Sequence, residues 1–437
     1  MEDEGTPIGG TTRFGRPYLK VAAVAALAAG ILGVGLLGPH MAGTLSHTAP
    51  PSLLAGSATP AAPVAGGATP AAAATGIDAL AGLTRVELAP DAVRQSWLST
   101  QISSRSMASI GLRLFFVVGG DQIKSTVIGR EEGPNTLVSV PYCQTINQLA
   151  AAGDELAYVV TSPASPAAAI DGCGGSGTLS WSIWILDLVG GSPRQIAHGT
   201  LVPNSLEAAE SPIHLALTAS TFAFDRPTAS TDAGQGTTVE VHAIDGTPLW
   251  SSWSQAPVTS IMLGGKRLAV LTEASTQSGP MKRLWIADAG HPLLSEVARP
   301  ASSASFAPDG SYLAWDVWPS VAFGESSSLP EVAIEMLDSG RVQALTTLNA
   351  STMPESLQVS ISVTRAGPAI AWFATAPDGS VYPAFRFAGG GDGEILASSQ
   401  QPMWLSVEDG TLIWVAERSD GWSNVAFAVD MLSVASN

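Results

Sequence analysis

A short apolar phrase recurs seven times along this chain and limits the folds available to it. The clearest copy is "YLAWDV", which follows the turn Asp309-Gly310. Aligned on one apolar position, the copies are spaced 42, 66, 46, 45, 57 and 42 residues apart, at Leu114, Leu156, Phe222, Leu268, Leu313, Ile370 and Leu412. A period near 45 is typical of a propeller blade and too long for most solenoid turns.

Each repeat also carries a later strand and, in most cases, an outer one. The later strand ends on an aspartate in five repeats, at Asp187, Asp245, Asp288, Asp338 and Asp430. Outer strands follow, as in "PRQIAHG", "PLWSSWS" and "RVQALTT". Four strands in each repeat is the architecture of a propeller blade.

The last repeat has too little chain left for its own outer strand, because Asp430 lies seven residues before the C-terminus at residue 437. The segment "LTRVELA", Leu83–Ala89, alternates like a strand and precedes the first repeat. We expect it to complete the last blade, since an unpaired sheet edge invites aggregation.

The phrases "SFAPDGSYLAWDVW" (305–318) and "SIWILDLVGGSPRQIA" (182–197) resemble blades of the TolB-type, WD-repeat-like β-propeller superfamily. The resemblance covers most of residues 78–437 and implies an all-β propeller of seven blades. The first and sixth repeats match less well, so six blades is the alternative. Families with such blades range from periplasmic binding modules to the gating domain of prolyl oligopeptidase-like enzymes, so the resemblance implies a fold and no single function.

Residues 21–38 form a stretch without a charged or polar side chain, long enough to cross a bilayer as one helix. Arg13, Arg16 and Lys20 precede it, and cations mark the cytoplasmic side of a span. We expect an uncleaved, single-pass anchor with a cytoplasmic tail at 1–20. The alternative is a cleaved secretory signal, although Pro39, His40 and Met41 fill the natural cleavage site.

Residues 39–77 are dominated by Ala, Pro, Gly and Thr and predict a disordered linker, because they offer little to bury. The expected organisation is therefore tail 1–20, transmembrane helix 21–38, linker 39–77 and propeller 78–437. This arrangement places the propeller on the extracytoplasmic side of the cell membrane, in the cell envelope.

The formal charge of −17 belongs to the propeller, because Glu2, Asp3 and Glu4 balance the three cations before the span. Nucleic acid binds through clustered Lys and Arg that neutralise phosphates. An acidic domain repels it, so we expect no nucleic-acid partner.

Cys143 and Cys173 are the two cysteines of the chain. Disulfides persist outside the cytoplasm, and alternating strand directions bring the connections that hold these residues to one face of the propeller. We expect them to form a disulfide. A metal pair or a reactive thiol is the alternative, and neither has companion ligands nearby in the sequence.

No catalytic set stands out. The four histidines beyond the linker are scattered among repeats, and no Gly-x-Ser-x-Gly motif occurs. We expect no cofactor and no metal, and a non-catalytic module that binds an envelope protein or glycan. The alternative is an extracytoplasmic glycosidase or lyase that uses carboxylates in the central channel, for which the 34 acidic residues beyond residue 77 (37 less the first three) supply candidates.

Four connections between second and third strands are long and polar, at about 162–180, 227–238, 273–281 and 319–330. Topology places all four on one face of a propeller, and binding residues concentrate on such loops. We expect the partner to contact this face, with Trp181, Trp318 and Phe323 as aromatic contacts. The alternative is that these insertions are merely tolerated surface loops.

Overall fold

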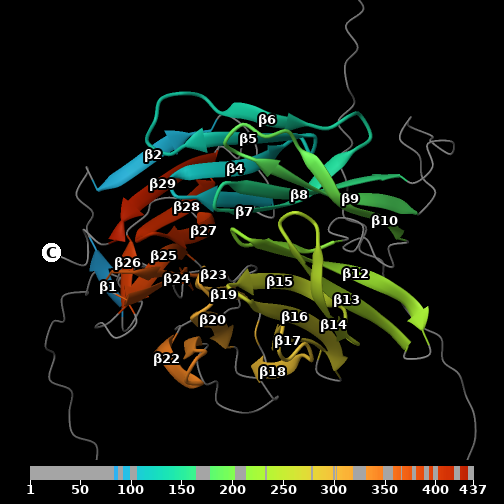
Figure 1. Cartoon of the computed structure of the whole chain (residues 1–437). Coiled ribbons are helices and arrows are strands. Elements are labelled where there is room, and N and C mark those ends of the chain that lie inside the picture. The colour runs from blue at the N-terminus through green and yellow to red at the C-terminus, as the bar shows by residue number, and fades with distance from the viewer. Residues whose placement is uncertain are drawn as a thin grey trace, which may run out of the picture. The chain divides into compact units, whose positions relative to one another are not determined.

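The structure, a computed structural model, consists of strands joined by turns (Figure 1). It describes residues 83–86, 92–98, 106–163, 178–201, 213–231, 234–276, 279–298, 301, 303–317, 331–347, 358–365, 367–375, 380–387, 393–396, 402–417 and 424–431. The chain separates into two units, Met1–Thr69 and Pro70–Asn437, and every described residue belongs to the second. The expected tail, span and linker all lie outside the described residues. In the part of the chain that is described, no helix is long and apolar enough to cross a membrane.

Seven sheets follow one another along the chain, and each is a blade. Blade 1 contains β3 (Met107–Ile110), β4 (Arg113–Val118), β5 (Gln122–Val127) and β6 (Asn135–Ser139). Blade 2 contains β7 (Thr145–Ala152), β8 (Glu155–Pro163), β9 (Leu179–Asp187) and β10 (Arg194–Leu201). Blade 3 contains β11 (Leu215–Leu217), β12 (Thr221–Thr231), β13 (Gly234–Ala243) and β14 (Pro248–Ser254). Blade 4 contains β15 (Val258–Gly264), β16 (Arg267–Thr276), β17 (Gly279–Asp288) and β18 (Ser295–Ala298).

The other three blades complete the domain. Blade 5 contains β19 (Ala304–Phe306), β20 (Tyr312–Val317), β21 (Glu331–Met336) and β22 (Arg341–Thr347). Blade 6 contains β23 (Val359–Thr364), β24 (Gly367–Thr375), β25 (Val381–Phe387), β26 (Gly393–Leu396) and a fifth strand, β1 (Leu83–Val86). Blade 7 contains β27 (Pro402–Glu408), β28 (Thr411–Glu417), β29 (Asn424–Asp430) and β2 (Val93–Trp97).

The first strand of each blade contacts the first strand of the next, and β27 contacts β3, so the seven first strands form a closed ring. The chain is therefore an all-β propeller of seven blades, and the count of six is excluded. The core lies between neighbouring blades. For example, Val239 and Val241 of β13 pack with Val258 and Ile261 of β15.

The seven residues that align the sequence repeats are all fully buried, at 0% exposure: Leu114, Leu156, Phe222, Leu268, Leu313, Ile370 and Leu412. Each lies in the second strand of its blade: six are the second residue of that strand, and Ile370 is the fourth residue of β24. The repeat in the sequence therefore marks the interior of each blade.

The aspartates that end the third strands form turns. The carboxylates of Asp187, Asp245 and Asp288 each accept the backbone N–H two residues further on. Such side-chain bonds favour a tight turn over continuation of the strand. The Thr247 N–H lowers the pKa of Asp245, and the N–H groups of His291 and Gly290 lower that of Asp288, because a carboxylate that accepts N–H groups is stabilised in its charged form.

An N-terminal strand does close the last blade, but it is not the expected one. β2 pairs antiparallel with β29 and forms the outer strand of blade 7, so blue β2 lies beside red β29 in Figure 1. Leu83–Val86 instead pairs parallel with β26 of blade 6. The prediction that Leu83–Ala89 completes the last blade is therefore wrong. Both segments can form strands, and pattern alone does not say which one meets β29.

Two of the expected loops are strands. β12 and β13 stay paired to Thr231 and Gly234, and β16 and β17 stay paired to Thr276 and Gly279. The segments 227–238 and 273–281 are thus mostly long hairpins, because their threonines and serines suit an exposed strand as well as a loop. Most of the other two expected loops, 162–180 and 319–330, lies outside the described residues.

Candidate functional site

We define the entry face as the side of the propeller on which each first strand begins and each second strand ends. The β12–β13 and β16–β17 hairpins project from this side, because second strands run toward it. The connections between blades also reach it. This face therefore combines a rigid ring of strand ends with two long hairpins, which is the arrangement in which binding surfaces are usually built.

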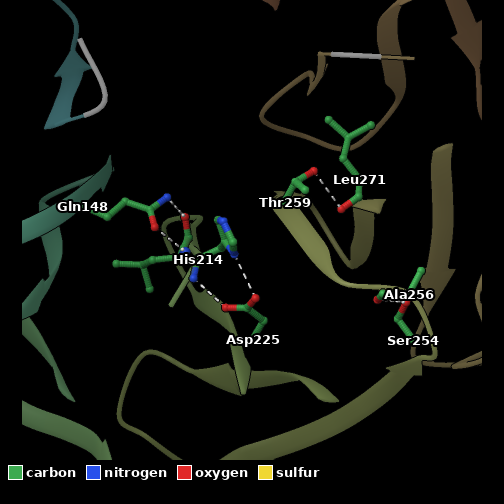
Figure 2. A network of polar contacts seen from close by, with 8 residues as sticks. Gln148, His214, Asp225, Ser254, Ala256, Thr259 and Leu271 are labelled. Carbon is green, nitrogen blue, oxygen red and sulfur yellow. Dashed lines mark hydrogen bonds and ion pairs between the residues drawn. The ribbon is translucent and has the colours of Figure 1, made fainter. Parts of the chain in front are cut away.

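A partly exposed histidine pairs with a buried aspartate where blade 3 begins on the entry face. Asp225 of β12 is 4% exposed and accepts bonds from the backbone N–H of His214 at 2.5 Å and from its ring Nδ1 at 2.8 Å. Figure 2 shows the Asp225 carboxylate facing both the backbone nitrogen and the imidazole of His214. The carboxylate thus holds both the start of β11 and the imidazole.

Blade 5 has a similar buried aspartate whose carboxylate accepts a backbone N–H, here that of a serine. Asp316 of β20 is fully buried, and its carboxylate accepts the backbone N–H of Ser303 at 2.5 Å. Ser303 in turn accepts the N–H of Val359 with its hydroxyl, which links blade 5 to blade 6. Asp225 and Asp316 occupy the same position, three residues after the aligned apolar residue.

Glutamine side chains join the first strands of two pairs of blades. The amide of Gln148 in β7 donates to Leu215 O at 3.3 Å and accepts from Leu215 N at 3.0 Å (Figure 2). Gln358, just before β23, makes the same two bonds to Leu405 of β27, at 2.8 and 3.0 Å. An amide that bonds both groups of one residue fixes the register between neighbouring blades.

The ring of first strands carries little charge. Among the residues of β3, β7, β11, β15, β19, β23 and β27, the one carboxylate is Glu408, the last residue of β27. Burial raises the pKa of Glu408, and its oxygens accept bonds of 2.6 Å from Ser109 Oγ and Gly111 N. Hydroxyl and amide groups otherwise supply the polar character of these strands.

Metal ligands do not gather in this region. Within the described ranges, no group of three or more His, Cys, Asp or Glu side chains has the geometry to hold a metal ion. The chemistry that the described entry face offers is hydrogen bonding and packing.

The structure separates the aromatic residues that were expected to contact a partner. Trp181 of β9 is 4% exposed and packs in the core between blades 2 and 3, 5.9 Å from the ring of Phe224. Its burial makes a direct contact difficult, and its role stays a prediction. Trp318 and Phe323 lie outside the described residues.

The expected disulfide also stays a prediction, since Cys173 is outside the described residues. Cys143 lies in the connection between β6 and β7, and its φ of 72° is in the left-handed region.

Sequence reasoning missed the two buried aspartates. Both were visible in "TFAFDR" and "YLAWDV", where an aspartate falls on an otherwise apolar strand. A buried carboxylate needs hydrogen-bond partners, so an acid at such a position is the signal of a polar link.

Comparison with solved structures supports the fold. The β-propeller domain of the Trilobed protease from Pyrococcus furiosus aligns over 77% of this chain and 96% of its own, with 11% identity and a TM-score of 0.50. That domain has an open velcro topology. At this identity the likeness bears on the fold alone.

Two enzymes align less well. The Pyrococcus horikoshii acylaminoacyl peptidase matches at 12% identity over 74% of this chain and 49% of its own, with a TM-score of 0.44. The Vibrio parahaemolyticus oligogalacturonate lyase matches at 11% identity over 73% and 74%, with a TM-score of 0.38. These scores are too low to support an inference about this chain. No protein-family model and no curated protein sequence matches it.

Proposed function

We propose that this chain is a non-catalytic binding module of the cell envelope that recognises a protein or glycan partner through the entry face of its propeller. The observation that carries the proposal is the contrast between the first strands, which line the centre of the propeller, and the hairpins of the entry face. The first strands supply one carboxylate, which neighbouring groups already bind, whereas the entry face presents the long β12–β13 and β16–β17 hairpins.

The alternative, a glycosidase or lyase, would need two carboxylates about 5 to 10 Å apart across a substrate. Asp225 is paired with His214 and Asp316 with the backbone of Ser303, so both have structural partners. The described channel strands thus favour binding. The TolB-type resemblance of the sequence bears on the fold of the domain and on no specific function.

The proposal includes the membrane location. Residues 21–38 anchor the chain, residues 39–77 act as a spacer, and the acidic domain lies outside the cytoplasm. Protease treatment of intact cells should then release the propeller and leave the span in the membrane. Full-length chain in the culture medium, or a mature N-terminus just after Gly38, would contradict the anchor.

The binding test uses the full-length chain in detergent and two envelope fractions, wall polysaccharide and solubilised membrane proteins. The variant replaces residues 274–281 with Asn-Gly, which joins the paired residues Glu273 and Lys282 by a two-residue turn. The parent should retain a component of one fraction, and the shortened hairpin should retain at least fivefold less.

The control changes the opposite face. Val189 and Leu293 are 76% and 83% exposed in turns between third and fourth strands, so V189S/L293S should bind like the parent. Equal retention by all three proteins would place the partner elsewhere. Release of new reducing ends or unsaturated sugars from the polysaccharide would instead establish the enzyme.

A further inference from the structure

One side of blade 3 brings an exposed indole next to a charged pair. Arg226 of β12, Thr238 of β13 and Trp253 of β14 are direct cross-strand partners in one row. Glu240 lies on the same side of the sheet, because residues two apart along a strand share a face. We call Arg226, Thr238, Glu240 and Trp253 the blade-3 patch. It lies on the half of the blade nearer the entry face.

The ring of Trp253 rests on a glycine. A Cβ at Gly236 would lie 2.5 Å from Nε1 and 2.6 Å from Cε2 of Trp253, so only glycine lets the indole occupy this position. The side chain nevertheless stays 44% exposed. A large aromatic ring is thus supported on one side by the backbone at Gly236 and partly open to solvent.

The charged pair is held in place by further contacts. Arg226 NH2 lies 2.6 Å from Glu240 Oε1, and Glu240 Oε2 lies 3.1 Å from His242 Nε2. The His242 ring stacks on Phe222, with centroids 5.2 Å apart, and its Nδ1 lies 3.1 Å from Gly246 O. The carboxylate is therefore oriented from the core side, while the Arg226 side chain is 52% exposed.

These groups match the chemistry of a sugar. The C–H groups on one side of a pyranose ring carry partial positive charge and are attracted to the negative face of an indole. Sugar hydroxyls both donate and accept, so they suit a carboxylate and a guanidinium fork placed side by side. A protein hot spot would instead centre on a larger apolar cluster excluded from water.

We infer that the blade-3 patch is a glycan-binding subsite, in which a sugar ring stacks on Trp253 and its hydroxyls bind Arg226 and Glu240. The inference rests on the proposed binding function and names its ligand class. The formal charge of −17 disfavours polyanions, so the ligand class is a neutral glycan.

The experiment titrates the full-length chain with three neutral probes, maltotriose, mannotriose and triacetylchitotriose, and with anionic trigalacturonate. Saturation-transfer NMR and calorimetry report binding. At least one neutral trisaccharide should bind, and W253A should weaken it tenfold or more. W253F keeps an aromatic ring and should stay within about threefold of the parent.

Two further variants test the position of the Trp253 ring and the role of Arg226 while the indole is retained. G236A retains Trp253 but displaces it, and should weaken binding severalfold. R226A removes the exposed fork and should do the same. L293S, on the opposite face, should bind like the parent. Circular dichroism and melting temperature verify the fold of each variant.

Failure of the inference can be told from failure of the proposed function. If no neutral trisaccharide binds, or if W253A and G236A bind like the parent, the glycan subsite is wrong. Retention of an envelope component that still depends on the β16–β17 hairpin would then leave the binding function intact. Capture of an envelope protein that W253A abolishes, without sugar binding, would also overturn the subsite.

Discussion

The carboxylate of Glu408 accepts a hydrogen bond of 2.6 Å from the backbone N–H of Gly111. A second bond of the same length comes from the Ser109 hydroxyl. Glu408 ends β27 in blade 7, and Gly111 follows β3 in blade 1, so one side chain ties the last blade to the first. Burial raises its pKa, because the charged form loses hydration.

The raised pKa of Glu408 predicts how the free energy of unfolding changes with pH. The folded chain holds the Glu408 proton more tightly than the unfolded chain, whose ordinary value is 4.5. The free energy of unfolding should therefore fall as pH rises from 4.5 through the folded pKa. In E408Q this fall should disappear, while the amide still accepts from Gly111 and donates to Ser109. Urea unfolding of the parent and of E408Q between pH 4 and 8 measures this difference. The same dependence on pH in both proteins would contradict the role of the Glu408 carboxylate.

E408A provides the matched comparison. It loses both bonds and leaves the Gly111 N–H without this acceptor, so it should be less stable than E408Q by about 1 to 3 kcal/mol. The difference should hold across the pH range.

The closing strand can be tested by two deletions. Removal of residues 91–98 takes away β2 and Leu98, which is 1% exposed between blades 7 and 1. It should cost at least about 3 kcal/mol and cause aggregation, since the edge of β29 is opened. Removal of residues 78–90 takes away only the fifth strand of blade 6 and should cost less. Thermal melting and size-exclusion chromatography compare them, and equal losses would refute the assignment.

The buried aspartates should stabilise the start of their blades. D225A removes the carboxylate that accepts from the His214 N–H and ring, and should lower the free energy of unfolding by about 2 to 3 kcal/mol. D225N keeps one carbonyl acceptor and should lose less. D316A makes the same test in blade 5, where the aspartate accepts the Ser303 N–H. A loss below 0.5 kcal/mol for both alanine variants would show that these carboxylates are dispensable.

Removal of the glutamine side chains that join neighbouring blades should disturb the register between their first strands and leave the apolar packing intact. Q148L keeps the volume of the side chain but removes both bonds to Leu215, so it should cost about 1 to 3 kcal/mol. Hydrogen exchange should quicken at Leu215 N–H in particular. Q358L makes the same change between blades 6 and 7, and should quicken exchange at Leu405 instead. Unchanged exchange at these amides would contradict the bridges.

The disulfide prediction needs only a thiol count. Alkylation of native envelope-derived protein without reductant should label neither Cys143 nor Cys173, and prior reduction should allow both to react. Labelling of both without reductant would reject the bond.

The sequence repeat was a sound guide to the blades because it reports burial. Leu114, Phe222 and Ile370 differ in type and neighbours, yet each fills the interior of a blade. Hydrophobic periodicity records such positions directly.

The sequence was a poorer guide to partners and polar links. Leu83–Val86 and Val93–Trp97 are close in the chain, and which of them meets β29 depends on contacts with residues more than 300 positions away. Likewise, a lone Asp225 in an apolar strand gives no sign that His214 is its partner. The polarity of residues 227–238 also concealed a hairpin, because exposed strands and loops share threonine and serine.

The pairing of β2 with β29 has a consequence for synthesis. A ribosome makes Val93–Trp97 more than 300 residues before Asn424–Asp430, so the seam of the ring cannot form until the strands of all seven blades have been translated. The six earlier blades can collapse as they emerge, but each leaves an apolar face that only the next blade covers. The final joining of β2 to β29 is a long-range step that closes a very large loop, and its entropic cost is met only once the other blades are in place. The native ring is therefore completed in a single late event, and a chain truncated anywhere before Asp430 would be left open.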